Sequence, residues 1–362
     1  MMSPGTLLRF LFRPLRQQLL RKPKAPTPLR PPALDVELTN ACNAKCIFCP
    51  REKTPLQGFM DPATFTRIIA RAQELSTRPR LDLCGLGEPL LHPQVVDFAR
   101  QSAAAGINTG LTTNGSKLTR ELSQALLDAG LARMHFSASG IHAQYAQIHG
   151  LDFDRTRRNI ADFVQLAGPR CRTVITIVAN ELNRDHISEL KAYWQKVGVH
   201  RFLLLFVSNR AGALETNSPC SANDRFLRQA RKLLARRGIG TLCEVPFCCT
   251  FIGWNGNYYT CCQDYTKSYP LGNVFQHSIP QINSLKRDLL AAGWDLCRQC
   301  SADFLNMTQE ILFKIEAKTA PKWELRNKLV GLEERQRLLR STAVEYGPAP
   351  AWQPGRADRH AA

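Results

Sequence analysis

Residues 37–50 read ELTNACNAKCIFCP and place three cysteines, Cys42, Cys46 and Cys49, directly after a short apolar run. Their spacing is C-x3-C-x2-C. Three thiolates can fill three iron corners of a [4Fe-4S] cluster and leave the fourth iron open for a further ligand. A zinc site is the alternative, but zinc favours paired C-x2-C units and a fourth protein ligand. The stretch therefore predicts a cluster site with one open coordination position.

Around this stretch, short apolar runs alternate with segments of helical period. Strands are expected at 34–38, 80–84, 107–111, 132–136, 172–178 and 202–206, with helices at 65–75, 95–104, 118–127, 159–166 and 187–194. Six such repeats predict an α/β fold with a parallel sheet and right-handed crossovers. They occupy about 175 residues, whereas a closed eight-stranded barrel needs about 250. We therefore predict a partial (β/α)6 TIM-type barrel, open on one side, with functional groups at the carboxyl ends of its strands.

The thirteen cysteines of the chain are clustered. Residues 243–264 read CEVPFCCTFIGWNGNYYTCCQD, and CRQC follows at 297–300. The clustering and the odd total argue against a secreted disulfide framework and favour metal or cluster ligation in a reducing compartment. We expect a small cysteine-rich C-terminal module that is held together by its ligands.

The C-x3-C-x-aromatic-C pattern, with Phe48 as the aromatic residue, resembles the signature of the radical S-adenosylmethionine (SAM) superfamily. In that family the open iron chelates the amino and carboxylate groups of SAM. One electron then splits SAM into methionine and a 5′-deoxyadenosyl radical, which takes a hydrogen atom from the substrate. The resemblance implies an oxidoreductase-type enzyme that receives electrons from an external flavodoxin- or ferredoxin-like donor.

Other strand exits resemble the SAM-binding segments of this family. The sequence CGLGEP at 84–89 resembles its GGEP stretch, with Leu86 interrupting the glycine pair, and TTNG at 112–115 resembles its TNG segment. Glycines allow the backbone to approach a ligand, and a glutamate can accept a charge-assisted hydrogen bond from the SAM ammonium group. SASG at 137–140 offers a serine, without the acidic residue that usually accompanies it. The resemblance implies SAM contacts from Phe48, Gly85, Gly87, Glu88, Pro89, Thr113, Asn114 and Ser137, with Asn180 as a further candidate.

Residues 243–300 resemble the SPASM/twitch extension of radical SAM enzymes, in which a cysteine, a glycine, four residues and a second cysteine precede a C-x2-C pair. Gly256 followed by four residues leads to Cys261. The resemblance implies one auxiliary [4Fe-4S] cluster, because the further cysteines of the full pattern do not occur after the C-x2-C pair. Its expected ligands are Cys243, Cys261, Cys297 and Cys300, with Cys248 or Cys249 as the alternative to Cys243. A structural zinc site with four cysteine ligands is also compatible with this spacing.

The chain is expected to divide into six segments. These are a basic amphipathic leader and Pro-rich linker at 1–33, the barrel at 34–210, a connecting segment at 211–240, the auxiliary cluster domain at 241–303, C-terminal helices at 304–346 and a disordered tail at 347–362.

The net charge of +18 suggests a nucleic-acid partner. No helix-turn-helix, RNP or zinc-finger pattern accompanies this charge, so nucleic acid is not expected. Residues 7–20 mix Leu and Phe with Arg at helical spacing and are too short and too charged to span a bilayer. A peripheral membrane contact, a packed leader and a transit peptide all fit this segment. We expect a cytoplasmic protein, with membrane association through residues 7–20 as one option.

The sequence favours a small polar or carbohydrate-like substrate, which is dehydrogenated or epimerised. No peptide-recognition domain is visible at the amino terminus, but the SPASM/twitch resemblance also permits a peptide-modifying maturase. A non-catalytic zinc-binding, cysteine-rich protein is the alternative from a different class.

Overall fold

The first part of the chain forms six parallel strands, as the alternation of apolar runs predicts. The computed structural model describes residues 33–54, 56–214, 243, 245–292 and 294–302. The strands are β1 (Ala33–Val36), β2 (Arg80–Leu83), β3 (Asn108–Thr113), β4 (Arg133–Ser137), β5 (Arg172–Ala179) and β6 (Phe202–Phe206). Each strand pairs in parallel with the next one along the chain. The predicted α/β partial barrel is confirmed.

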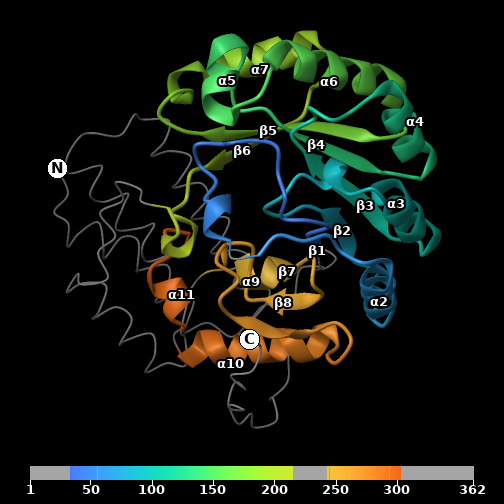
Figure 1. Ribbon diagram of the computed structural model, residues 1–362, viewed down its shortest axis with the longest axis vertical. Helices are drawn as coiled ribbons and strands as arrows, with labels where there is room; N and C mark the ends of the chain where they lie inside the picture. Colours follow the sequence, from blue (N-terminus) through green and yellow to red (C-terminus); the bar gives the residue numbers. More distant parts are fainter. Residues whose placement is uncertain (1–32, 55, 215–242, 244, 293, 303–362) are drawn as a thin grey trace, which may run out of the picture.

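Helices connect these strands and lie on the outer side of the curved sheet (Figure 1). They are α2 (Pro62–Gln73), α3 (Val95–Ala104), α4 (Arg120–Asp128), α5 (His142–His149), α6 (Phe153–Ala167) and α7 (Ile187–Lys196), with single 3-10 turns η1 (Arg51–Lys53), η2 (Pro89–Leu91), η3 (Arg184–His186) and η4 (Arg210–Gly212). Of the helices, α5 was not expected from the sequence. It is only eight residues long and ends at Gly150, whose φ of +65° terminates the helix.

The core lies between the sheet and these helices, because alternate strand residues point to opposite faces. Leu81 and Leu83 of β2 are buried in it, whereas Asp82 between them is partly exposed on the concave face. The Phe65 and Phe98 rings of α2 and α3 stack with their centroids 4.2 Å apart. The concave face therefore remains available for polar side chains.

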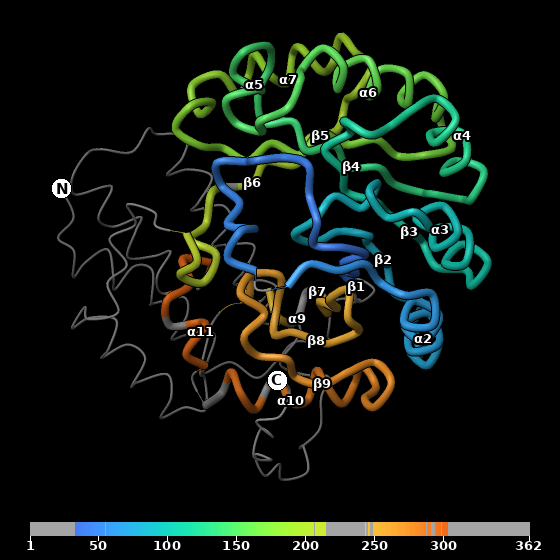
Figure 2. Tube along the Cα trace, in the orientation of Figure 1, coloured from blue at the N-terminus to red at the C-terminus, as the bar shows by residue number. Residues whose placement is uncertain are grey.

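The cysteine-rich module continues the same sheet. Its elements are α9 (Val245–Cys248), β7 (Cys249–Ile252), β8 (Asn257–Tyr259), β9 (Pro270–Asn273), α10 (Ile279–Ala292) and α11 (Asp295–Arg298). Strand β7 pairs in parallel with β1, and β8 and β9 follow as antiparallel neighbours. The described sheet thus has nine strands in the order β6-β5-β4-β3-β2-β1-β7-β8-β9, and Figure 2 shows β1 and β7 side by side. The pairing fixes the module rigidly to the strand that leads into the first cysteine motif.

Several expectations concern segments outside the described residues. They are the leader, except for its last residue, most of the connecting segment at 211–240, the C-terminal helices and the tail. Within the described part of the chain, no helix combines the length and apolar character needed to cross a membrane. The bounds of the six segments stay predictions.

Candidate functional site

The loop that carries Cys42, Cys46 and Cys49 runs between β1 and η1 across the middle of the curved sheet (Figure 1). All three cysteines are half-buried. Burial is the main cause that raises the pKa of each thiol, and Coulombic repulsion from neighbouring cysteines adds to it at Cys42 and Cys46. Three thiolates in this setting need a cationic partner, and iron binding removes their protons. The donor set therefore fits an iron–sulfur cluster.

A single metal ion fits this loop less well than a cluster. Within the described residues, no three His, Cys, Asp or Glu side chains converge closely enough to hold one ion. In a cubane each thiolate binds a different iron, so its ligands stand further apart than those around a single ion.

The loop is held by hydrogen bonds at both of its ends. The Arg51 guanidinium donates to the backbone oxygen of Cys42. The Thr39 hydroxyl donates to the Gly58 oxygen over 2.7 Å, and the Asn40 amide donates to the Leu56 oxygen. These contacts fix the loop with protein groups alone, which preorganises it for a ligand.

Helix α5 supports the middle of the loop. The backbone N–H groups of Lys45 and Ile47 donate to the oxygens of His149 and Ile148 over 2.9 and 3.0 Å. His149 Nδ1 lies 3.2 Å from the Sγ of Cys46. His149 is fully buried, and burial lowers its pKa to about 3. Sequence reasoning missed this histidine, because neither periodicity nor a motif connects positions 46 and 149.

Glu88 connects two of the predicted SAM segments. Its Oε1 accepts hydrogen bonds from the Thr113 hydroxyl over 2.6 Å and the Leu90 N–H over 3.1 Å, and its Oε2 accepts from the Asn114 N–H over 2.7 Å. Burial raises the pKa of this carboxyl group, although these hydrogen bonds oppose the shift. A carboxylate offers about four acceptor positions, and these three bonds leave one for a ligand donor.

The two predicted glycines allow close contact between protein segments. A Cβ atom on Gly85 would lie 2.5 Å from Cγ of Glu37, and one on Gly87 would lie 2.1 Å from the backbone oxygen of Thr39. From the sequence, these glycines are expected to let the backbone approach a ligand. The structure shows that they let the CGLGEP segment pack against the residues that follow β1 and lead into the cysteine loop.

The remaining predicted residues lie at the same carboxyl edge of the sheet, in different surroundings. Asn114 donates from its side chain to Asn43 Oδ1 over 3.0 Å, which ties the TTNG segment to the cysteine loop. Ser137 ends β4 and is partly exposed. Phe48 packs in an apolar cluster with Ile148 and Val178. Pro89 is the first residue of the turn η2. Asn180 lies in the segment after β5, where its side-chain amide donates to the Val178 oxygen over 2.9 Å.

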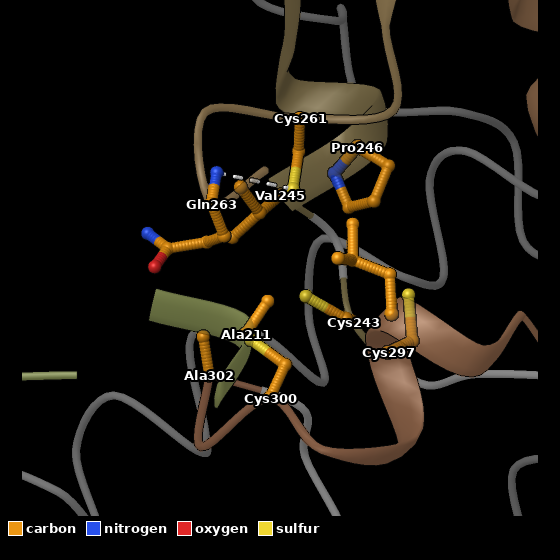
Figure 3. A pocket seen from close by; sticks show the side chains of 10 residues that line it. Ala211, Cys243, Val245, Pro246, Cys261, Gln263, Cys297, Cys300 and Ala302 are labelled. Carbon is orange, nitrogen blue, oxygen red and sulfur yellow. Dashed lines mark hydrogen bonds between the residues drawn. The ribbon is translucent and has the colours of Figure 1, made fainter. Parts of the chain in front are cut away.

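The second site is a small cavity in the C-terminal module. Cys243, Cys261, Cys297 and Cys300 all line it, and Figure 3 shows their side chains arranged around the space. Burial raises the pKa of Cys261, and Coulombic repulsion from neighbouring thiols adds to it. The structure thus brings together the four cysteines that the SPASM resemblance implies.

The neighbouring cysteines form a separate group. Cys249 begins β7, and its side chain lies beside those of Cys262 and of Asp35 in β1. Asp35 also contacts Cys84, which follows β2. Cys249 is not part of the cavity lining, whereas Cys243 is. The side chain of Cys248, the other alternative, lies outside the described residues, so the choice of the first auxiliary ligand stays a prediction.

The two thiol sites are joined through a small apolar cluster. Leu86, Ala213 and Tyr265 are buried together, and Cys49 of the first site packs against them. Tyr265 follows Cys261 by four residues, and its backbone oxygen accepts a hydrogen bond from the Thr54 hydroxyl over 3.0 Å. Packed protein atoms therefore connect the first cysteine loop directly to the C-terminal module.

Two cations also lie at this junction. Lys267 is 3.4 Å from Glu37 and stands over the Phe251 ring, 3.9 Å from its centroid. Arg210 stands 5.0 Å from the centroid of the Tyr265 ring, and its Nε is buried without a hydrogen-bond partner among the described residues. Sequence reasoning singled out neither cation, because each is placed by contacts between distant segments.

Comparisons with known proteins match two regions of the chain to known families. Residues 36–193 match the radical SAM superfamily model, and residues 243–301 match the SPASM model, which describes an iron–sulfur cluster-binding domain. A cofactor-modifying protein for tungsten-containing aldehyde ferredoxin oxidoreductase from Pyrococcus furiosus is 24% identical over 178 residues, which cover 47% of this chain and 50% of that protein. The PqqA peptide cyclase of Methylocella silvestris is 27% identical over 218 residues, which cover 57% of each chain.

A similar fold occurs in a solved structure. The crystal structure of SuiB from Streptococcus suis bound to the precursor peptide SuiA has a TM-score of 0.57 at 16% identity, with 83% of this chain and 76% of that chain covered. The chain spans about half the length of the curated relatives that it matches.

The two matched regions contain the two thiol sites, the cysteine loop in one and the four-thiol cavity in the other. The cofactors are a [4Fe-4S] cluster that binds SAM, SAM itself and a SPASM auxiliary cluster. The chain belongs to the radical SAM superfamily of enzymes and carries a C-terminal SPASM iron–sulfur cluster-binding domain.

Proposed function

We propose that this protein is a radical SAM oxidoreductase that abstracts a hydrogen atom from a small polar or carbohydrate-like substrate. Cys42, Cys46 and Cys49 hold the cluster that binds SAM, and Cys243, Cys261, Cys297 and Cys300 hold the auxiliary cluster. When bound, the first cluster supplies the electron that cleaves SAM to methionine and a 5′-deoxyadenosyl radical. The family membership favours an enzyme over the non-catalytic zinc protein that the cysteine pattern alone allowed.

The observation that carries the proposal is the connection between the two thiol sites. Cys49 packs against Leu86, Ala213 and Tyr265. Ala211, two residues before Ala213, lines the four-thiol cavity. This arrangement supports an electron path between the first cysteine loop and the auxiliary site. The potential of such a site depends on its charge and hydrogen bonds, so either direction of electron flow is compatible with it.

Residues at the carboxyl edge of the sheet are proposed to bind SAM. Glu88 has one acceptor position left after its three hydrogen bonds, and it would receive the SAM ammonium group. Ser137, partly exposed at the end of β4, would donate to a ribose or carboxylate oxygen. Phe48, the two glycines, Thr113 and Asn114 would shape this pocket through the packing described above.

The concave face of the sheet supports a polar substrate. Asp35, Asp82, Gly110 and Arg133 lie in register on four neighbouring strands. Arg133 donates to Asp82 over 2.8 Å, and a Cβ atom at Gly110 would lie 2.4 Å from the Asp82 carboxylate, so the glycine makes room for this ion pair. Arg133 is the first residue of β4, so this charged layer forms a polar floor of the concave face, on the amino side of the proposed SAM site. A polar floor is better suited to hydroxyl and amino groups than to an apolar molecule.

A peptide substrate is the second candidate. The matched PqqA peptide cyclase is named for a peptide, and the SuiB structure contains a precursor peptide. In this case the same radical chemistry would modify a side chain or backbone position of a peptide.

The first experiment measures 5′-deoxyadenosine after anaerobic incubation of the reconstituted protein with SAM and a strong reductant. Cys42→Ala, Cys46→Ala and Cys49→Ala should each abolish its formation. A Cys297→Ala/Cys300→Ala variant should retain some SAM cleavage but lose substrate turnover. Cys171→Ala is the matched control, because Cys171 is buried at the amino end of β5, away from both sites. Full turnover without Cys297 and Cys300 would contradict the auxiliary role.

Metal analysis tests the cofactor content independently of turnover. Two cubanes correspond to about eight irons per chain, since each holds four. Zinc without iron in protein reconstituted anaerobically would refute the proposal. Deuterium transfer from labelled sugars or labelled peptides into 5′-deoxyadenosine then separates the two substrate classes, because the abstracted atom ends in that product.

A further inference from the structure

The sulfur of Cys46 has a side-chain hydrogen-bond partner in His149. The Cys46 Sγ and His149 Nδ1 atoms are 3.2 Å apart, although 103 positions separate the residues in the chain. The sulfur of Cys42, by contrast, accepts a hydrogen bond from a backbone group, the Ala44 N–H, over 3.4 Å. Among the described residues, His149 is the single side chain that bonds to a sulfur of the cysteine loop.

The proton position on the imidazole follows from its other nitrogen. His149 Nε2 lies 2.9 Å from the backbone nitrogen of Ser139, which is a donor. Nε2 must therefore accept, and in a neutral imidazole the proton then resides on Nδ1. The group that faces Cys46 is consequently an N–H donor.

The histidine is held in this position from several sides. It is fully buried, and its backbone oxygen accepts a hydrogen bond from the Lys45 N–H over 2.9 Å. The Phe48 ring meets it edge-on at 5.8 Å, and the Tyr145 ring lies 4.7 Å away. Gly150 follows with a φ of +65°, and a Cβ atom there would approach Lys45 to 3.1 Å. The ring cannot turn away from the sulfur without disturbing the cysteine loop.

We propose that His149 is a positioning residue that donates a hydrogen bond to the Cys46 thiolate and thereby raises the reduction potential of the SAM-binding cluster. This inference rests on the proposed role of Cys46 as a cluster ligand. An N–H donor withdraws electron density from the sulfur and stabilises the more negative, reduced state of the cluster. Outer-shell hydrogen bonds of this kind orient the ligand and tune the metal site.

A pair of substitutions separates the bond to Cys46 from the bond to Ser139. In His149→Asn the side-chain nitrogen can take the place of Nδ1, so the donor to Cys46 is retained while the acceptor for Ser139 is lost. In His149→Gln the amide reaches the position of Nε2, so an acceptor for Ser139 is retained while the donor to Cys46 is lost. Both variants bury one amide in place of the imidazole, so each controls for the other.

The measurement is an EPR-monitored redox titration of the reconstituted full chain, read on the signal that changes when SAM is added. His149→Gln should reduce the ratio of reduced to oxidised cluster at a fixed potential about tenfold, which corresponds to about 59 mV for one electron. His149→Asn should stay close to the wild type. Equal potentials in all three proteins, or equal shifts in both variants, would overturn the proposal.

Two further readouts keep the test decisive. The potential of the auxiliary cluster in the same samples should be unchanged, which separates a local effect from general loosening of the fold. If a variant fails to fold, wild-type protein with 15N-labelled histidine is reduced and examined for a histidine nitrogen coupled to the SAM-responsive cluster, and no coupling would overturn the proposal. A wild type without any SAM-responsive cluster would instead refute the proposed function.

Discussion

Glu88 shows how one buried carboxylate can organise a ligand site. Its two oxygens accept from Thr113, Asn114 and Leu90, so a single residue joins segments that follow β2 and β3. Burial disfavours the charged form and raises the pKa of Glu88. A bound ammonium group would offset part of this cost.

Glu88→Gln should therefore weaken SAM binding. Loss of a charge-assisted hydrogen bond costs about 1.5–3 kcal/mol, which is about a ten- to hundredfold loss of affinity. Affinity in the wild type should also fall as the pH is lowered through the raised pKa of Glu88, because only the carboxylate accepts from the ammonium group. Anaerobic calorimetry at several pH values measures both effects. An equally steep pH dependence in the glutamine variant would contradict this role.

At the scale of elements, an ion pair fastens the C-terminal module to the residue that follows β1. The Glu37 side chain is fully buried and that of Lys267 is 9% exposed. Glu37 also accepts the Leu86 N–H over 2.9 Å, so it connects the CGLGEP segment to the module. Lys267 has a φ of +54°, which is uncommon for a residue with a side chain and is maintained here by the surrounding contacts.

Lys267→Met should lower the free energy of unfolding by about 3–5 kcal/mol, because it leaves the Glu37 carboxylate buried without its cation. Glu37→Gln combined with Lys267→Met should recover part of this loss, since no uncompensated charge remains. Denaturant unfolding of the four proteins in a double-mutant cycle measures the coupling. Additive effects of the two substitutions would show that the pair does not act as a unit.

At the scale of the whole molecule, Arg210 stands between the two thiol sites. The segment that follows β6 is tied to the C-x2-C region, because the Asn209 N–H donates to the Ser301 hydroxyl over 2.9 Å. Burial alone would lower the pKa of Arg210, because it disfavours the charged form. Coulombic attraction to Tyr265, Cys262 and Cys49 outweighs burial and holds the pKa above the ordinary value. This cation therefore lies in the field of thiols from both regions.

Arg210→Gln should lower the reduction potentials of both clusters, because a nearby cation stabilises the more negative, reduced state. Arg210→Lys should keep most of the effect, since it preserves the charge. EPR-monitored redox titration of the reconstituted protein gives both potentials in one experiment. A shift confined to one cluster would place Arg210 at that site alone instead of between the two.

Much of the architecture could be predicted from local patterns. The spacing of apolar residues along the chain predicts the alternation of strands and helices. Strand β6 and helix α3, for example, occur where the sequence predicts them. Helix α5 could not be predicted because its apolar residues are too few for a clear period. The pairing of β7 with β1 joins segments more than 200 residues apart, and no local signal records it.

The sequence by itself determined the chemistry of the protein, because ligand spacing such as that of Cys42, Cys46 and Cys49 is a local property of the chain. The tertiary structure decided which thiols meet. It places Cys243 at the cavity and turns Cys249 toward Asp35 of β1. It also brings His149 to the sulfur of Cys46. These contacts depend on how distant strands and helices pack, and packing is set by the fold as a whole and not by neighbouring residues.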